Sequence, residues 1–328
     1  MLGPITTGTL DIETTASLFV VGTDSFNGIG DNLSPALDYN GDGLTEVAVS
    51  SYFLDSTIGS AVHLIPTTRR GSLTIEQAEF GRITGTSDDY FTLGGIMYGT
   101  SDIDGDHADD LLIGSPNAYR NGVELSGTLY HISGAFATNS TAATIAKTTF
   151  LGAEYDALSA VTVQDLDGDG TEDYVIGAAL NAAGGTDAGA VYSFYGPLSG
   201  TIEMDQADVV QTGVAGELLG YQLETAEDMD GDGLADLWAA ATDSSLAAAA
   251  AGAVYLLPAT ATSRDARANA IASLAGESAE DVFGFDVATL DMDADGNQDV
   301  LVGAVWQSQG GEKSGKAYLF YGPFAGSI

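Results

Sequence analysis

Cysteine is absent from this chain of 328 residues, and histidine occurs only as His63, His107 and His131. Without cysteine, the chain can form no disulfide bridge, no thiol nucleophile and no zinc site of the cysteine type. Basic residues are scarce as well: nine Lys and Arg stand against 47 Asp and Glu, which gives a formal net charge of −38. Nucleic acids and anionic membranes are bound through basic side chains, so this balance argues against both partners and favours cations.

Long apolar runs are also absent. No stretch approaches 18 uninterrupted apolar residues, and the N-terminal MLGPITTGTL lacks the basic start and apolar run of a signal peptide. We therefore expect no membrane insertion. Hydrophobic residues still make up 45% of the chain, enough for a sizeable core. The acidic excess resembles the solvated surface of proteins from salty or extracellular surroundings, and we expect an extracellular or cell-surface protein whose signal peptide is not part of this chain.

One acidic stretch of nine residues occurs five times. It reads DYNGDGLTE at 38–46, DIDGDHADD at 102–110, DLDGDGTED at 165–173, DMDGDGLAD at 228–236 and DMDADGNQD at 291–299. The first residues of successive copies lie 64, 63, 63 and 63 positions apart. Such a constant period indicates one structural unit that has been copied. We expect a single domain that spans residues 1–328, because a closed repeat fold can exceed the usual domain length.

Short apolar runs separated by Gly and Ser flank each acidic stretch and predict β-strands. In the third copy these runs are 160–164, 174–178, 190–195 and 207–212. The chain is therefore expected to be all-β, with four strands in each copy and the acidic loop between the first and second strands. The five alanines at 247–251 have high helix propensity. They occupy the place of a Gly-rich connection in other copies, so we expect a loop there.

Both ends of the chain fall at the same point of the repeat. LGPITTG at 2–8 matches YGPLSG at 195–200, and the chain stops after YGPFAGS at 321–327. The last copy therefore lacks a fourth strand, while residues around 14–21 form a fourth strand that no copy precedes. We expect this N-terminal strand to join the last blade and to close a β-propeller of five four-stranded blades, which removes exposed sheet edges. A piece excised from a longer array fits the same register.

The acidic stretch has the pattern of a calcium loop. Carboxylates at positions 1, 3, 5 and 9 converge on one point, and position 7 offers a backbone carbonyl. Carboxylates so close together repel one another unless a cation lies between them, and several oxygen ligands in a flexible loop favour calcium over magnesium. An EF-hand needs glutamate at position 12. That position is apolar in all five copies, as Val49, Ile113, Ile176, Ala239 and Val302.

We therefore expect about five structural calcium ions. The candidate ligands are the residues at positions 1, 3, 5, 7 and 9 of the five loops: Asp38, Asn40, Asp42, Leu44, Glu46, Asp102, Asp104, Asp106, Ala108, Asp110, Asp165, Asp167, Asp169, Thr171, Asp173, Asp228, Asp230, Asp232, Leu234, Asp236, Asp291, Asp293, Asp295, Asn297 and Asp299. The first two loops depart most from the pattern, because Asn40 and Glu46 replace aspartate and His107 takes a glycine position. We interpret His107 as a surface substitution rather than a ligand.

Dipeptides before the loops and tripeptides after them complete a larger pattern. They are Leu219-Gly220 and Phe283-Gly284 before the loops, and Gly114-Ser115-Pro116, Gly177-Ala178-Ala179 and Gly303-Ala304-Val305 after them. This spacing resembles FG-GAP repeats, the units of integrin alpha-subunit β-propellers and of many bacterial surface proteins. The resemblance covers nearly the whole chain and implies a propeller whose calcium loops lie opposite the usual ligand face. Integrin-like rings have seven blades, and the first and fourth copies lack the GAP-like tripeptide.

No catalytic motif stands out, since the chain has neither a Gly-rich phosphate loop before a helix nor a GxSxG elbow. An acid repeated in every blade is structural, whereas a catalytic acid should be singular. Singular residues include Tyr52, Tyr119, Arg120 and Trp306, whose side chains suit a carbohydrate or protein ligand. We therefore expect a non-enzymatic, calcium-binding module for binding or adhesion. The alternatives are a propeller-fold glycosidase or lyase and a ligand-free spacer of a larger surface protein.

Overall fold

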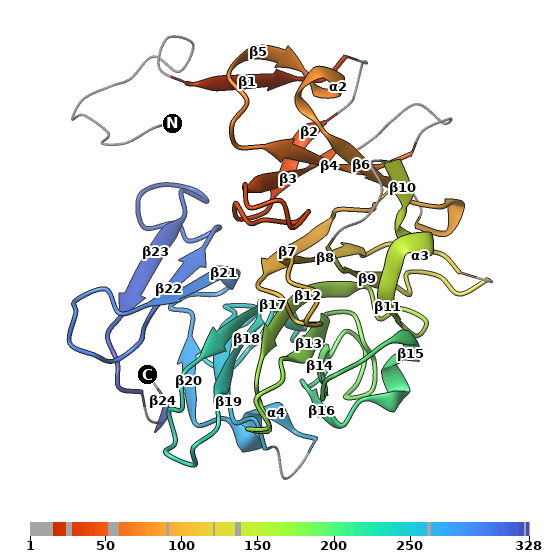
Figure 1. Cartoon of the computed structure of the whole chain (residues 1–328). Coiled ribbons are helices and arrows are strands. Elements are labelled where there is room, and N and C mark those ends of the chain that lie inside the picture. The colour runs from red at the N-terminus through yellow and green to blue at the C-terminus, as the bar shows by residue number, and fades with distance from the viewer. Residues whose placement is uncertain are drawn as a thin grey trace. The chain divides into compact units, whose positions relative to one another are not determined.

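The computed structural model describes residues 16–23, 28–51, 59–89, 92–120, 122–134, 139–260, 264–324 and 326–327. The chain divides into two compact units, one of residues 1–115 with 130–147 and one of residues 116–129 with 148–328. Both consist of β-strands joined by loops and a few one-turn helices (Figure 1). The all-β class predicted from the sequence is confirmed. Among the described residues, no helix is long and apolar enough to cross a membrane.

The first unit is built on one mixed sheet and a separate pair of strands. Its elements are β1 (Leu18–Val21), β2 (Ile29–Leu33), β3 (Glu46–Ser51), β4 (Ala61–Pro66), β5 (Gly71–Thr74), α2 (Ile75–Ala78), β6 (Gly81–Thr84), η1 (Ser87–Asp89), β7 (Ile96–Thr100), β8 (Asp110–Ser115), β10 (Asn139–Thr141) and α3 (Ala142–Ile145). The sheet has the order β10-β6-β4-β3-β2 and is antiparallel apart from β10. Strand β1 pairs in parallel with β5.

The second unit contains three successive sheets. Its elements are β12 (Leu158–Gln164), β13 (Asp173–Ala178), β14 (Ala190–Phe194), β15 (Gly200–Glu203), η2 (Met204–Gln206), β16 (Val209–Thr212), β17 (Leu219–Ala226), β18 (Asp236–Ala241), β19 (Ala253–Leu257), α4 (Ala266–Asn269), β20 (Ala272–Ala275), β21 (Phe283–Leu290), β22 (Asp299–Ala304), β23 (Lys316–Phe320) and β24 (Gly326–Ser327). The sheet orders are β12-β13-β14-β16, β17-β18-β19-β20-β24 and β21-β22-β23. A further sheet has the order β15-β11-β9-β8-β7. It includes β9 (Thr128–Ile132) and β11 (Ala146–Leu151), and boundaries between the two units fall within these two strands.

The strand order agrees with the prediction at each acidic stretch. Every acidic loop joins two neighbouring antiparallel strands, which are β2–β3, β7–β8, β12–β13, β17–β18 and β21–β22. In the third copy the four predicted strands appear as β12, β13, β14 and β16, with small shifts at their ends. Residues 247–251 form a loop as expected, despite their helix propensity.

In the second, third and fifth copies, one short strand was not predicted. After its third strand, the chain forms β10, β15 or β24, each of which pairs in parallel with the fourth strand of the preceding copy: β6, β11 or β20. These segments read NST, GTIE and GS, so they lack the apolar alternation that identifies a strand. Strand β1 has the same parallel relation to β5 and thus occupies the place of a fourth strand. It falls within the predicted segment 14–21, of which residues 14 and 15 lie outside the described residues.

The core of the second unit lies between its sheets, which stand side by side (Figure 1) with β17 in contact with both β12 and β21. Because a middle sheet packs on both faces, its strands are apolar on both faces, and β18 and β19 are buried throughout. Trp238, for example, is 1% exposed and meets Phe324 edge to face. In the last sheet, by contrast, Leu301 and Leu319 are 37% and 39% exposed. That sheet therefore has one apolar face without a covering sheet in the described part of the unit.

Glycines allow successive sheets to approach backbone to backbone. A Cβ atom on Gly177 of β13 would lie 2.0 Å from the carbonyl oxygen of Gly220 of β17. Gly252, before β19, has a φ of +86°, and a Cβ atom there would lie 2.1 Å from the carbonyl oxygen of Phe283. Any larger residue at these positions would push the sheets apart.

We predict that Gly252→Ala destabilises the protein by about 2 kcal/mol more than Gly216→Ala. Both glycines have positive φ, +86° and +79°, but within the described structure a Cβ atom on Gly216 would meet nothing within 4 Å. The control variant therefore carries only the backbone strain, roughly 1 to 2 kcal/mol, while Gly252→Ala adds the clash between sheets. Denaturant unfolding of the two variants measures the difference, and equal losses would refute the close approach.

Candidate metal sites

Each acidic loop is folded by hydrogen bonds from its own backbone to its own carboxylates. In the third loop, Asp165 accepts hydrogen bonds from the N–H groups of Gly168 and Gly170 at 2.8 and 2.9 Å. Asp167 accepts one from Asp169 at 3.1 Å, and Asp169 accepts one from Thr171 at 2.7 Å. The fourth loop repeats all four bonds, and the other loops repeat most of them. The side chains at positions 1, 3 and 5 are thereby held along one short turn.

The carboxylate at position 9 is the buried end of the loop. Asp173 is 1% exposed, and its Oδ2 accepts a hydrogen bond from the N–H of Leu166, at position 2, at 2.8 Å. The same bond recurs at Asp110, Asp236 and Asp299 with lengths of 2.7 to 2.8 Å. Position 2 and position 9 therefore close the base of the loop, where the second strand begins.

The second oxygen of this carboxylate separates the loops into two kinds. In the third and fifth loops, Oδ1 of Asp173 and of Asp299 accepts a backbone N–H, from Gly196 and Gly322. In the other three loops the corresponding oxygen is buried and has no hydrogen-bond partner among the described residues: Glu46 Oε2, Asp110 Oδ1 and Asp236 Oδ1. A buried anionic oxygen without a partner is costly, and a bound cation removes that cost. The site chemistry therefore fits a metal ion.

Carboxylates of the second to fifth loops converge closely enough to share one ion. Ligand atoms lie within 4.8 Å of one another in the groups Asp102-Asp104-Asp106, Asp165-Asp167-Asp173, Asp228-Asp230-Asp236 and Asp291-Asp293-Asp295. The first loop, where Asn40 replaces aspartate, is not among these groups. Oxygen ligands in such number are those that calcium prefers. Four of the five predicted loops could therefore hold a metal ion.

Electrostatics agree with this geometry. The pKa of Glu46 is raised to about 7, mainly by burial and also by the neighbouring carboxylates of Asp42 and Asp38. Burial likewise raises the pKa of Asp236 to about 6, together with the charges of Asp230 and Asp232. Each of these two carboxyl groups is thus held near the negative charges of its own loop, at a cost that a divalent ion would reverse.

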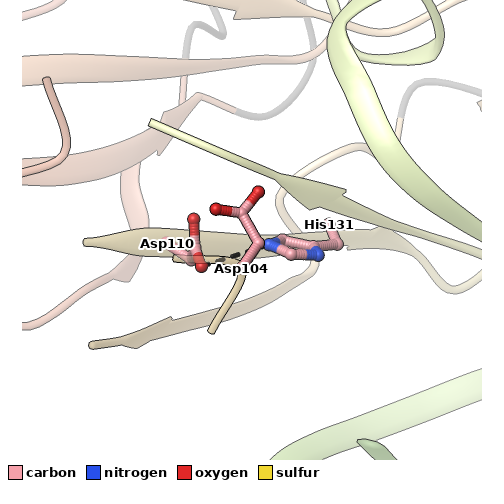
Figure 2. Close-up of side chains that lie close together, drawn as sticks. All are labelled: Asp104, Asp110 and His131. Carbon is pink, nitrogen blue, oxygen red and sulfur yellow. Dashed lines mark ion pairs between the residues drawn. The ribbon is translucent and has the colours of Figure 1, made fainter. Parts of the chain in front are cut away.

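The second loop has a histidine and a lysine beside its carboxylates. The buried His131 lies with its Nε2 3.3 Å from Oδ2 of Asp110, and Asp104 lies beside them (Figure 2). Lys147 Nζ is 2.7 Å from Oδ2 of Asp104, a side chain that is 5% exposed. Burial alone would raise the pKa of Asp104, but the hydrogen bond from Lys147 lowers it below the usual value. A fixed ammonium group therefore already neutralises part of this loop.

His107 lies in the same loop, at the glycine position. Its side chain is 95% exposed and its φ is +76°. This matches the surface position expected for it. Sequence reasoning missed His131 and Lys147, because they lie on later strands, β9 and β11. Histidine and lysine are rare in so acidic a chain, and this rarity could have identified both residues as candidates.

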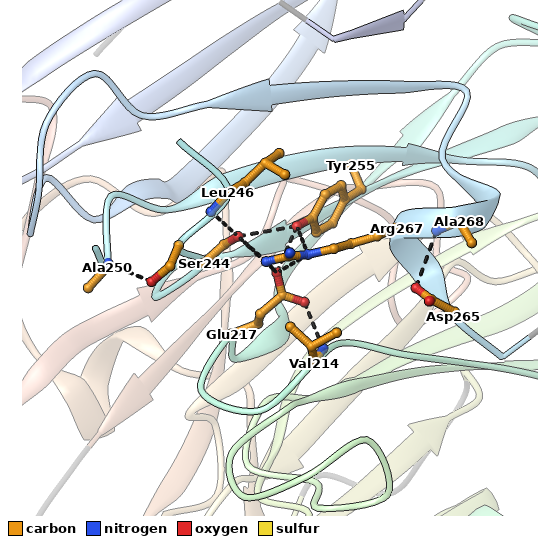
Figure 3. A network of polar contacts seen from close by, with 10 residues as sticks. Val214, Glu217, Ser244, Leu246, Ala250, Tyr255, Asp265, Arg267 and Ala268 are labelled. Carbon is orange, nitrogen blue, oxygen red and sulfur yellow. Dashed lines mark hydrogen bonds and ion pairs between the residues drawn. The ribbon is translucent and has the colours of Figure 1, made fainter. Parts of the chain in front are cut away.

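A second set of buried acids has no unpartnered oxygen of this kind. Its members, Asp89, Asp156, Glu217 and Asp281, precede the first strands of the second to fifth copies, and each accepts the backbone N–H three residues earlier. Glu217 is the most fully paired (Figure 3): it accepts hydrogen bonds from Ser244 and Tyr255, both at 2.8 Å, and from Arg267. Burial raises the pKa of Tyr255 to about 12, so its hydroxyl stays a donor. These acids are satisfied by protein donors and brace the turns, and sequence reasoning did not single them out.

Three side chains, Ser51, His63 and Glu79, are arranged like the catalytic triad of a hydrolase. Ser51 Oγ lies 2.9 Å from His63 Nε2, and His63 Nδ1 contacts Glu79. Ser51 is fully buried, and the second oxygen of Glu79 is paired with Arg82 at 2.7 Å. A nucleophile needs access to its substrate, so this arrangement is better explained as a buried polar network.

The ligand-binding residues predicted from the sequence have separate surroundings. Tyr52 lies outside the described residues. Tyr119 is 44% exposed, and Arg120 forms a 3.2 Å ion pair with Glu203. Trp306 is 47% exposed, with Lys313 Nζ 4.0 Å from its ring centroid. The described structure shows no common site for them.

Comparison with known proteins gives no relative on which to base a function. No protein-family model matches the chain, and no curated protein matches it significantly. The function must therefore be inferred from the residues and their geometry.

We predict that Lys147→Met strengthens calcium binding at the second loop by roughly tenfold, about 1.4 kcal/mol. The substitution removes the ammonium group that competes with a cation for Asp104. Isothermal titration with calcium measures the affinity of the weakest site. The control is Lys316→Met, which removes the same charge from an ion pair with Glu277, a residue outside the acidic loops. Identical titrations for the two variants would show that Lys147 has no special effect.

Proposed function

We propose that this protein is a calcium-stabilised β-propeller of the FG-GAP type, and that it acts as a binding or adhesion module outside the cell. The observation that supports calcium most strongly is the buried, unpartnered oxygen at position 9, found in three of five loops of constant spacing. The glycines that bring successive sheets together are those of the predicted dipeptides and tripeptides, such as Gly220 and Gly177. This contact gives the sequence pattern a physical reason.

Two unfilled surfaces support closure of the sheets into a ring. Within the described part of the first unit, a Cβ atom on Gly30 of β2 would meet nothing within 4 Å, whereas the corresponding Gly220 and Gly284 meet the preceding sheet. At the other end, Gly315 corresponds to Gly252, yet its nearest neighbour would be at 3.4 Å, within its own sheet. Gly30 thus lies on the face that would pack against a preceding sheet, and Gly315 lies on the face that would pack against a following sheet. We therefore propose that β1 adds to β23 as the fourth strand of the fifth blade.

Closure predicts that Gly315→Ala is as damaging as Gly252→Ala. Both residues have positive φ, +74° and +86°, so the backbone strain is similar. In a closed ring a Cβ atom on Gly315 would also strike the backbone of the first blade, at a total cost of roughly 3 kcal/mol. Denaturant unfolding compares the two variants. If Gly315→Ala costs only the roughly 1 to 2 kcal/mol of strain, the chain is an open piece of a longer array.

A role outside the cell is consistent with the exposure of the sites. Positions 3 to 6 of the loops are exposed or half-buried, and the ions would lie at the surface. Exposed, flexible loops of this kind suit the low affinities of extracellular calcium modules, about 10⁻⁴ to 10⁻³ M. Calcium would then be structural, because it binds the folded loops and adds its binding free energy to that of folding. The surfaces away from the loops would remain available for a protein or carbohydrate ligand.

We predict that chelation lowers the melting temperature by about 5 °C or more and that added calcium restores it. The effect should be larger at pH 8 than at pH 5. In the metal-free chain, the raised pKa values of Glu46, about 7, and Asp236, about 6, favour the protonated fold, so this contribution to stability is lost as the pH rises through these values. At pH 8, bound calcium would neutralise the carboxylates that have lost their protons.

A matched pair of variants locates this effect. Asp230→Asn removes a loop carboxylate and should reduce the calcium-dependent rise in melting temperature. Asp205→Asn removes an exposed acid outside the loops and should leave the rise unchanged. If calcium leaves the melting temperature of the unsubstituted protein unchanged, the structural role of the metal is contradicted.

A further inference from the structure

A cavity of about 610 Å³ opens where three successive sheets of the second unit meet. It is lined by residues at the starts of β12, β17 and β21 and by two residues that follow β8 and β22: Ser159, Tyr221, Gln222, Phe285, Asp286, Pro116 and Val305. Its size lies within the range of about 300 to 1,000 Å³ that is usual for small-ligand sites. None of these residues belongs to an acidic loop.

Irregular strand starts place the aromatic residues in this cavity. The register of β17 against β18 shifts between Leu219 and Leu223, and that of β21 against β22 shifts between Phe283 and Val287. Gly220 and Gly284 adopt positive φ at these shifts. A bulge re-aims the side chains that follow it. Each glycine is followed by an aromatic and then a polar residue, and these four side chains line the cavity.

Two rings form an apolar platform. The centroids of Tyr221 and Phe285 are 5.6 Å apart, and their planes are inclined by 42°. Phe285 is 42% exposed, so part of its ring is accessible to a ligand. The corresponding residues of the first three copies are Asp31, Gly95 and Ala160, so the aromatic pair is particular to the fourth and fifth copies. A feature that is not repeated is a better candidate for recognition than one that the repeat imposes.

Polar groups beside the platform are only partly used within the protein. Gln222 Nε2 is 3.4 Å from Asp286 Oδ1, which also accepts the N–H of Val287 at 3.1 Å. Gln222 Oε1 and Asp286 Oδ2 have no hydrogen-bond partner among the described residues. The rim of the cavity thus offers an amide, which can donate hydrogen bonds to hydroxyl groups and accept them, and a carboxylate, which can accept them.

We propose that this cavity binds a neutral sugar residue of a glycan, with its apolar face on Phe285 and Tyr221 and its hydroxyls on Gln222 and Asp286. The proposal rests on the proposed function as a binding module and names its ligand class. No Lys or Arg lines the cavity, and the chain carries a net charge of −38, so sulfated or uronic glycans would be repelled. The rings pack against each other and do not face one another across a gap, so they do not form a cage for a cationic group.

The test is binding of the calcium-loaded protein to an array of neutral, sulfated and sialylated oligosaccharides. Binding to neutral members is expected, with a loss of at least tenfold in Phe285→Ala and a smaller loss in Asp286→Asn. The control is Tyr321→Ala, which removes an aromatic residue that is 57% exposed and does not line the cavity, and it should bind as the unsubstituted protein does. Phe285 and Asp286 lie at the surface of the sheet, and unchanged melting curves would show that these variants fold.

Several results would overturn the inference. They are no binding to neutral glycans, preference for acidic glycans, and neutral binding that persists in Phe285→Ala. Tight binding of a fluorescent oligolysine peptide that Phe285→Ala abolishes would also overturn it, in favour of a cationic partner. Each of these leaves the proposed calcium-stabilised fold intact as long as calcium still raises the melting temperature. Failure of that calcium effect would count against the proposed function itself.

Discussion

The mutual repulsion of carboxylates held in one short turn is the constraint on which the rest of this structure depends. The loop backbone satisfies only some of their oxygens. Strands β3, β8 and β18 each begin at a buried acid whose second oxygen has no hydrogen-bond partner in the described part of the chain. A cation at that point converts the repulsion into an attraction that ties two strands together. Glu217, by contrast, is satisfied by four protein donors, so this fold can also pair a buried acid without an ion.

Close packing between sheets is the second constraint. A sheet whose two faces both meet neighbours must be apolar throughout, and its backbone must approach the next sheet at points such as Gly252 and Gly177. The last sheet is different: Leu301 alternates with buried residues and Leu319 with half-buried ones, and both leucines are exposed. An exposed apolar face of this kind is typical of a surface that contacts another part of a protein or a partner.

Much of the fold and of the metal loops could be predicted from the sequence, because both depend on local patterns. The loops at 165–173 and 228–236 carry their geometry in their own residues, and the flanking strands follow from apolar alternation. Features that depend on distant residues could not be predicted. Lys147 reaches Asp104 only after folding, and β15 is a strand only because β11 lies beside it. The platform of Tyr221 and Phe285 requires two strands that are remote in sequence.

The central claim is that the acidic loops are completed by calcium, and counting the ions tests it most directly. Native mass spectrometry of the metal-depleted chain, titrated with calcium, resolves each bound ion by its mass. The account predicts at least four calcium ions per folded chain, with the second loop, where Lys147 competes, the last to fill. A folded chain that binds no calcium, or binds it without regard to the loop aspartates, would contradict it.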